Sequence, residues 1–199
     1  MIAKICGITN AGDAQAAVEG GATALGFNFY PRSPRYVAPG RAAELAAVLP
    51  PSVWKVGVFV NETAAHVAAI ARDTGLDVVQ LHGDEIAADY PAGLRVWKAV
   101  RVAGAFDPAL WNDCPAEALL LDGPAGALYG GAGVPFDWSL VPAGRRIVLA
   151  GGLDESNVRA AIAQAHPWGV DACSRLESAP GRKDHRKMAA FLRAALEPL

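Results

Sequence analysis

The segment WKVGVFVNETAAHVAAIARDTGLDVVQLHG, residues 54–83, contains the repeating unit of the fold. It opens with the β-type run Trp54–Val60, continues through the amphipathic helical stretch Thr63–Arg72, and closes on a second β-type run, Val78–Leu81. Two strands joined by a helix pair in parallel, because the helix carries the chain back across the sheet with a right-handed crossover. The segment therefore predicts one βαβ unit.

The same alternation extends to both ends of the chain. The predicted strands are Ile2–Cys6, Ala24–Phe29, Trp54–Val60, Val78–Leu81, Val96–Val100, Ala118–Leu121, Ile147–Ala150 and Val170–Cys173. Further helical stretches are Ala11–Glu19, Ala38–Leu49, Glu155–Ala165 and Lys183–Leu196, with a less regular one at Phe106–Trp111. Eight strands leave roughly 25 residues for each strand, helix and pair of loops, which is near the minimum. We expect an α/β protein with one domain over residues 1–199, a closed (β/α)8 TIM barrel.

Composition narrows the class of protein. The chain has 199 residues, a charged fraction of 19% and a net charge of −2 without a basic block, which argues against nucleic acid as a partner. The N-terminus lacks the apolar run of a signal peptide, and no apolar segment is long enough to predict a membrane span. Three cysteines without a CxxC pair argue against a disulfide framework or a cysteine zinc site, and the histidines show no metal-ligand spacing. We expect a cytoplasmic protein.

Cys6 ends the first predicted strand, where barrel enzymes carry their chemistry. The two-residue period of a strand places Lys4 on the same face as Cys6, one layer deeper in the barrel. A buried lysine needs a partner, and Asp171 on the last strand is the candidate, because the first and last strands pair when a barrel closes. Cys6 is either a small buried filler or a general base whose thiolate is stabilised by a nearby positive charge.

Asp122 directly follows the apolar run Ala118–Leu121. A strand-end aspartate can simply cap the next turn. Alternatively, a desolvated pocket or a bound anion favours a proton on the carboxyl, and Asp122 then acts as a general acid. One base and one acid on opposite sides of a pocket is the arrangement that proton-shuttling isomerases require.

Other strand ends carry residues suited to binding a substrate. Gly151-Gly152 and Cys173-Ser174 follow the seventh and eighth predicted strands, where barrels often bind phosphate. Arg35 lies in a loop stiffened by two prolines and could hold a carboxylate, and His82 could donate a hydrogen bond near the mouth. Gly130–Gly133 is interpreted as a wall of the pocket. Arg35 could instead be an exposed arginine in a turn, and Gly151-Gly152 could be a simple glycine turn.

These residues together resemble the phosphoribosylanthranilate isomerases, the third-step enzymes of tryptophan biosynthesis from chorismate. The resemblance spans essentially the whole chain in order. It is carried by Lys4-Ile5-Cys6-Gly7-Ile8-Thr9, Gly26-Phe27, Ser33-Pro34-Arg35-Tyr36-Val37, Val56-Gly57-Val58-Phe59-Val60-Asn61, Gln80-Leu81-His82-Gly83, Leu121-Asp122, Phe136-Asp137-Trp138, Gly151-Gly152-Leu153, Asn157-Val158, Glu177-Ser178-Ala179-Pro180-Gly181 and Lys183-Asp184.

The resemblance implies an Amadori rearrangement without cofactor or metal. Asp122 would be the general acid that opens the furanose ring, and Cys6 the general base that removes the C2′ proton. Arg35 would bind the anthranilate carboxylate, and Gly151, Gly152, Cys173 and Ser174 would form the phosphate cradle. The partner would be a small phosphorylated substrate, and the protein would be a monomer or a homodimer, since the family includes both.

The chain departs from the family pattern at two places. Gly131-Ala132-Gly133 stands where the family usually has Gly-Thr-Gly, and Cys173-Ser174-Arg175 stands where it has Ser-Ser-Gly. Three rival readings remain. The related barrel isomerase of histidine biosynthesis has an aspartate at the first strand end, where this chain has Cys6. An enzyme acting on both substrates, and a barrel that only binds a phosphorylated metabolite, are the other two.

Overall fold

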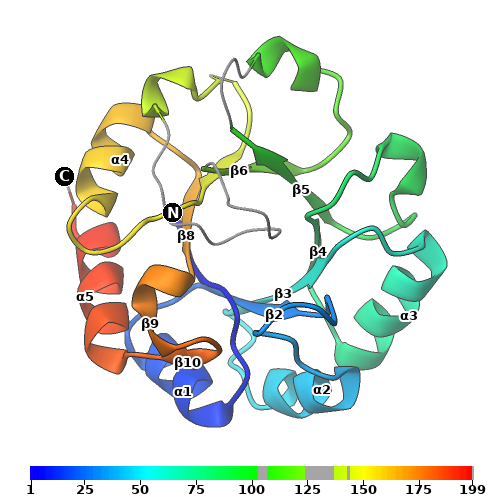
Figure 1. Cartoon of the computed structure of the whole chain (residues 1–199), viewed down its shortest axis with the longest axis horizontal. Coiled ribbons are helices and arrows are strands. Elements are labelled where there is room, and N and C mark those ends of the chain that lie inside the picture. The colour runs from blue at the N-terminus through cyan, green and yellow to red at the C-terminus, as the bar shows by residue number, and fades with distance from the viewer. Residues whose placement is uncertain (103–106, 124–136, 143, 199) are drawn as a thin grey trace.

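The computed structural model describes residues 1–102, 107–123, 137–142 and 144–198. Eight parallel strands close into a barrel in chain order, with helices around the outside (Figure 1). The strands are β1 (Ile2–Ile5), β2 (Ala24–Asn28), β3 (Trp54–Phe59), β4 (Val78–Leu81), β5 (Val96–Arg101), β6 (Ala118–Asp122), β7 (Ile147–Leu149) and β8 (Gly169–Ala172). The predicted TIM barrel is confirmed.

The pairing of β1 with β8 closes the barrel. Lys4 lies opposite Asp171 in this pair, and Ile5 lies opposite Ala172. The next residue, Cys6, continues the ladder by donating its backbone N–H to the carbonyl of Ala172 at 3.0 Å. Gly7 then turns the chain away from the barrel with a φ of 74°, a conformation that favours glycine. Cys6 is therefore held at the rim by regular sheet geometry.

Four α-helices and three short 3₁₀ helices connect the barrel strands of the described part; a fifth α-helix, α5, follows the last strand, and a fourth 3₁₀ helix, Ser174–Leu176, comes directly after β8. The α-helices are α1 (Ala11–Glu19), α2 (Pro39–Ala47), α3 (Ala64–Thr74), α4 (Val158–Ala165) and α5 (His185–Leu196). The 3₁₀ helices Ala87–Asp89, Pro108–Trp111 and Trp138–Leu140 stand in the connections β4–β5, β5–β6 and β6–β7. A strand hairpin, β9 (Glu177–Ala179) with β10 (Arg182–Lys183), follows β8. The short connections explain how eight strands fit into so short a chain.

Side-chain caps set the true helix starts, and two predicted α-helices begin two or three residues later than expected. The stretch predicted from Glu155 becomes helical only at Val158, because Asp154 and Asn157 accept the backbone N–H groups of Ser156 and Asp154. The last helix starts at His185 rather than Lys183, because Lys183 pairs in the hairpin and Asp184 caps the helix. The predicted Phe106–Trp111 helix is reduced to Pro108–Trp111, and Phe106 lies outside the described residues.

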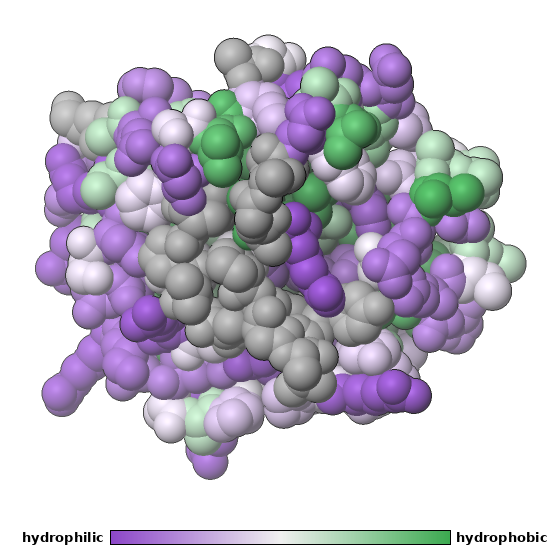
Figure 2. Space-filling view, turned by 45° about the horizontal axis from the view of Figure 1, so that its top comes forward, coloured by the Kyte–Doolittle hydropathy of each residue, from purple (hydrophilic) through white to green (hydrophobic). Residues whose placement is uncertain are grey.

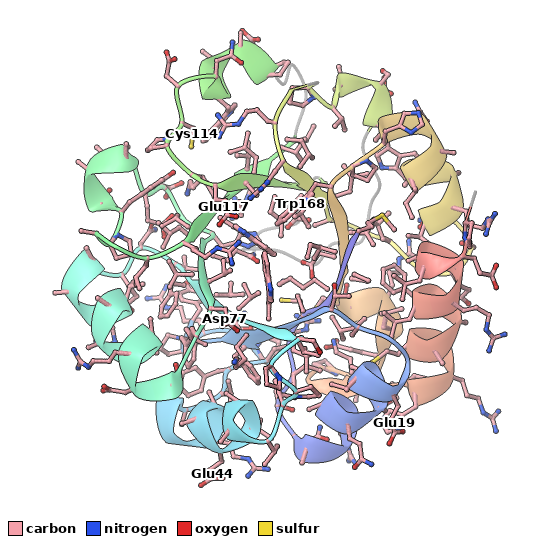
Figure 3. All side chains as sticks on the ribbon, turned by 180° about the vertical axis from the view of Figure 1, so that it is seen from behind. Glu19, Glu44, Asp77, Cys114, Glu117 and Trp168 are labelled. Carbon is pink, nitrogen blue, oxygen red and sulfur yellow. The ribbon has the colours of Figure 1, made fainter. Side chains whose placement is uncertain are left out.

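Three tryptophans pack at the end of the barrel where the strands begin. The ring of Trp97, which is fully buried, lies 5.6 Å from that of Trp168 and 6.0 Å from that of Trp54. Arg95 stacks over Trp54 and Arg146 over Trp168, and both arginines pair with Glu117. Seen from behind, Trp168 and Glu117 lie near the barrel axis (Figure 3). In a TIM barrel this end supports stability, since the chemistry sits at the opposite end.

Trp97→Ala is expected to lower the free energy of unfolding by roughly 3–5 kcal/mol, because it removes a fully buried indole and leaves a cavity. Urea unfolding followed by circular dichroism measures the change. Leu110→Ala is the control, since Leu110 is 79% exposed and its truncation should change stability by less than about 0.5 kcal/mol. Equal effects of the two substitutions would contradict the assignment of the tryptophan cluster to the core.

On the face drawn in Figure 2, hydrophilic residues predominate over the described part, and apolar side chains gather in small separate patches. Among the described residues, large exposed apolar side chains include Val48, Ile86 and Leu110. None of the described helices is both long enough and apolar enough to cross a bilayer.

Candidate active site

Lys4 and Asp171 form a buried ion pair inside the barrel. Nζ of Lys4 lies 2.9 Å from Oδ1 of Asp171, so the pair expected from barrel closure is present. Burial raises the pKa of Asp171 to about 7 even though the charge of Lys4 opposes that shift. Burial lowers the pKa of Lys4, but the negative groups Asp171 and Cys6 outweigh this and hold it above its usual value. The lysine therefore stays charged beneath Cys6.

The thiol of Cys6 is in contact with a second thiol, that of Cys173. A hydrogen bond from Cys173 lowers the pKa of Cys6, and the charges of Lys4 and Lys183 lower it further against the effect of burial. The same contact raises the pKa of Cys173. Gly26 on β2 leaves room for this arrangement, since a Cβ there would lie 2.8 Å from Sγ of Cys6 and 3.1 Å from Nζ of Lys4. Cys6 is thus the thiol that ionises first.

Arg35 is held by a carboxylate from the hairpin. Its Nε and Nη2 donate to the two oxygens of Glu177, both at 2.8 Å. The hydrogen bond and charge of Glu177 raise the pKa of Arg35 above its usual value. Lys183, the register partner of Glu177 in the hairpin, adds a second cation at 3.1 Å from Oε1. The bidentate pair fixes the plane of the guanidinium at the mouth of the pocket.

Asp122 lies at the end of β6, almost fully buried, beside His82 from the end of β4. Nε2 of His82 is 3.4 Å from Oδ2 of Asp122. The side chain of Gln80 contacts Nδ1 of His82 at 3.1 Å. With the Gln80 amide nitrogen donating, Nδ1 is the acceptor and the imidazole proton sits on Nε2, which lies near Asp122 without a hydrogen bond to it.

The loop after β7 lies beside Asp122 and meets the segment after β8 at the rim of the pocket. Gly151 and Gly152 both have positive φ, 83° and 69°, and a Cβ on Gly151 would lie 2.2 Å from the backbone nitrogen of Gly123. Only glycine fits this approach. Arg175, from the loop after β8, places Nη1 3.7 Å from Oδ2 of Asp154 and also lines the pocket.

One pocket at the carboxyl ends of the strands is lined by nearly all the residues singled out from the sequence. They are Cys6, Arg35, His82, Asp122, Gly151, Gly152, Asp171, Cys173 and Ser174. Lys4 lies one layer below, as expected from the strand period. Gly130–Gly133, including Ala132, lies outside the described residues. The roles of these residues in binding and catalysis remain predictions.

Sequence reasoning missed Glu177, Lys183 and Gln80 as parts of the site. The first two had a signal, since charged residues stand at both ends of the turn Ser178-Ala179-Pro180-Gly181, and the two strands of a tight hairpin bring such residues together. Gln80 shares its face of β4 with His82 by the two-residue period. Among the described residues, no group of three or more His, Cys, Asp or Glu could hold a metal ion.

Fold and site together define a TIM-barrel enzyme in which a thiol and a carboxyl face one pocket. The family model described as N-(5'phosphoribosyl)anthranilate (PRA) isomerase matches residues 3–194. The chain is 61% identical over 196 residues to the N-(5'-phosphoribosyl)anthranilate isomerase of Solibacter usitatus, covering 98% of this chain and 97% of that protein. The chain therefore belongs to the N-(5'-phosphoribosyl)anthranilate isomerase family, the isomerases that act in tryptophan biosynthesis.

Solved structures agree with this assignment. The phosphoribosyl anthranilate isomerase of Thermotoga maritima superposes with a TM-score of 0.88 at 40% identity, with 98% of each chain covered. The enzyme from Thermus thermophilus gives a TM-score of 0.89 at 37% identity, again with 98% of each chain covered. A further structure of this isomerase, at 40% identity, TM-score 0.86 and 98% of each chain, holds reduced 1-(o-carboxyphenylamino)-1-deoxyribulose 5-phosphate.

Proposed function

We propose that Cys6 is the general base and Asp122 the general acid in the isomerisation of N-(5-phosphoribosyl)anthranilate to 1-(2-carboxyphenylamino)-1-deoxyribulose 5-phosphate. The observation that carries the proposal is that the thiol after β1 and the carboxyl of β6, two strands that are not neighbours, line one pocket. A proton donor and a proton acceptor on different sides of one sugar are what an aldose–ketose rearrangement needs.

The rearrangement begins with two proton transfers, and the final tautomerisation adds a proton to C1′ and removes one from the C2′ hydroxyl. Asp122 gives a proton to the furanose ring oxygen while the C1′–O bond breaks and the anthranilate nitrogen forms a double bond to C1′. Cys6 as thiolate then removes the C2′ proton, and the electrons of that C–H bond neutralise the iminium nitrogen to give an enolamine. The enolamine tautomerises to the ketone. Neither step requires a redox or metal cofactor.

The ends of the substrate are held away from the reacting carbons. Arg35, fixed by Glu177, presents its remaining N–H groups to the anthranilate carboxylate. The backbone N–H groups around Gly151, Gly152 and Ser174 receive the phosphate, in keeping with the phosphorylated ligand held by the similar isomerase. Cys173 contributes to this cradle only through its backbone, because its thiol faces Cys6.

The experiment that tests the proposed function follows the fluorescence of phosphoribosylanthranilate with the purified protein. We expect the fluorescence to disappear in a single exponential at low substrate, with formation of the ribulose phosphate. A barrel that only binds the substrate would leave the fluorescence unquenched over time. Turnover of the histidine-pathway substrate at a comparable rate would contradict the assigned specificity.

We propose that the enzyme works in the cytoplasm, because its described cysteines are all unpaired thiols. We also propose that the chain forms one domain, because its eight barrel strands close into a single barrel.

Arg35→Lys is expected to raise KM for phosphoribosylanthranilate about 10- to 100-fold with a much smaller change in kcat, because a lysine cannot keep both the Glu177 pair and the substrate carboxylate. Steady-state kinetics measures both constants. Arg41→Lys is the matched control, since Arg41 is an exposed residue of α2 paired only with Glu44 among the described residues. An unchanged KM in Arg35→Lys would exclude the carboxylate contact.

A further inference from the structure

Lys183 is a buried cation that the proposed proton transfers do not use. Its side chain has no exposed surface, although the residue belongs to the two-residue strand β10 at the edge of the molecule. Nζ lies 3.2 Å from the backbone oxygen of Cys173, 3.7 Å from its Sγ and 3.1 Å from Oε1 of Glu177. An ammonium group loses its hydration when buried in this way, so its position needs a compensating interaction.

The charges around Cys6 do not balance while both thiols are neutral. The charged and titratable groups that act on Cys6 and its partners come from every neighbouring element: Lys4 of β1, Arg35 after β2, Asp122 of β6, Asp171 of β8, Cys173 after β8, Glu177 of β9 and Lys183 of β10. Three cations surround the two thiols: Lys4 below Cys6, Lys183 beside Cys173, and Arg35 at the mouth of the pocket. Two carboxyl groups oppose them, Glu177 and Asp171, and Asp171 is only partly ionised near neutral pH because burial raises its pKa to about 7. A thiolate would offset the positive charge that remains.

Cys173 provides the path from Lys183 to Cys6. The ammonium group of Lys183 lies 3.7 Å from Sγ of Cys173. Cys6 and Cys173 follow the paired strands β1 and β8 and line the same pocket, and a hydrogen bond from the Cys173 thiol lowers the pKa of Cys6. A donor pointed at a sulfur stabilises the thiolate more than the thiol. The hairpin register, which sets Lys183 opposite Glu177, also fixes the height of the ammonium group relative to Cys173.

We propose that Lys183, acting through the Cys173 thiol, is a positioning residue that stabilises negative charge on Cys6. The inference rests on the proposed function, since it concerns the group assigned as general base. Lys4 supplies the cation below Cys6, and Lys183 supplies a second one from the β8 side. In the substrate-free enzyme the positive charge of Lys183 increases the fraction of Cys6 that is thiolate at neutral pH. Glu177 has the opposite effect on Cys6, because its negative charge offsets the positive charges of Lys183 and Arg35.

The test measures the thiolate of Cys6 without substrate. Wild type and Lys183→Met are alkylated with iodoacetamide across a pH series, and mass spectrometry of the digested protein reports the modification at each cysteine. We expect the pH of half-maximal alkylation at Cys6 to rise by at least about one unit in Lys183→Met, a tenfold loss of thiolate near neutral pH. Lys183→Arg keeps the charge and should stay within a few tenths of a unit of wild type.

Two further measurements distinguish an effect of the Lys183 charge from a general disturbance of the structure. Cys114, which contacts Tyr90 in the loop before β6, is the internal control, and its profile should not move. Glu177→Gln removes the opposing charge and should shift the Cys6 profile to lower pH, which also keeps the test informative if Lys183→Met fails to fold. Unchanged Cys6 profiles in the folded variants, or a shift of the same sign in Lys183→Met and Glu177→Gln, would overturn the role of Lys183.

The alkylation measurement separates this inference from the proposed function. If Lys183→Met leaves the Cys6 profile unchanged, Lys183 is excluded as the stabilising group while Cys6 can still be the base. If Cys6→Ser retains activity, Cys6 is excluded as the base while the alkylation profiles still report its ionisation.

Discussion

Asp122→Asn should abolish most of the turnover, with kcat/KM falling on the order of 10³-fold or more. Asparagine has nearly the same shape but carries no proton that it can release to the ring oxygen, so the furanose opens without acid assistance, which is worth about 10²–10⁴-fold. The buried carboxyl meets His82 at 3.4 Å, and the amide can occupy the same space, so the fold is expected to persist. Fluorescence decay of phosphoribosylanthranilate measures the rate, and circular dichroism verifies the fold.

Asp113→Asn is the matched control for this substitution. Asp113 is exposed and lies outside the pocket that contains Cys6. The activity of the Asp113→Asn enzyme should therefore equal that of the wild type. Near-full activity of a folded Asp122→Asn enzyme would show that the ring oxygen receives its proton from elsewhere.

Cys6→Ser is expected to reduce kcat/KM by roughly 10²–10⁴-fold, the usual contribution of a general base. The hydroxyl fits the site but ionises only at far higher pH than a thiol, so almost no alkoxide is present to take the C2′ proton. KM should change little, because the thiol is assigned no part in holding the carboxylate or the phosphate. Cys114→Ser, a partly buried thiol away from the pocket of Cys6, should leave both constants unchanged.

The pH dependence of the wild type gives a second check on Cys6. Because the base acts when deprotonated, the acidic limb of the kcat/KM profile should rise as pH increases through the pKa of Cys6. The Cys173 hydrogen bond and the charges of Lys4 and Lys183 hold that pKa well below its usual range, so the rise should be complete below pH ~8.5, where an ordinary thiol ionises. A rise centred at or above that pH would show that the cluster does not activate the thiol.

Much of the site could be predicted because, in a parallel barrel, the residue that ends each predicted strand lies at the same rim of the barrel as the ends of the other strands. Cys6, His82 and Asp122 each stand at the end of an apolar run, and barrel closure puts all strand ends at one rim. The Lys4–Asp171 pair followed from the same rule, since the first and last strands must be neighbours. These predictions needed only the two-residue period of strands and the chain order.

Other parts of the site could not be found this way. The pairing of Arg35 with Glu177 joins residues far apart in sequence, and no periodicity predicts which carboxylate an exposed-looking arginine will meet. The expected helix Phe106–Trp111 shortens to the 3₁₀ helix Pro108–Trp111, because helix formation in a short segment depends on the apolar face available for packing as well as on local preference. The hairpin after β8 is not predicted from the sequence, and its last residue, Lys183, falls in the predicted helix Lys183–Leu196.

The amino-acid sequence by itself indicated the barrel, the end of the barrel that carries chemistry and the residues that stand there, since eight strands alternating with helices favour a closed barrel over an open doubly wound sheet. Only the tertiary structure decided how these residues act on one another. The contact of Cys173 with Cys6 and the burial of Lys183 behind them depend on side-chain packing between β1, β8 and the hairpin. Charge and hydrogen bonding act through space, and the distances that set their strength exist only in the folded chain.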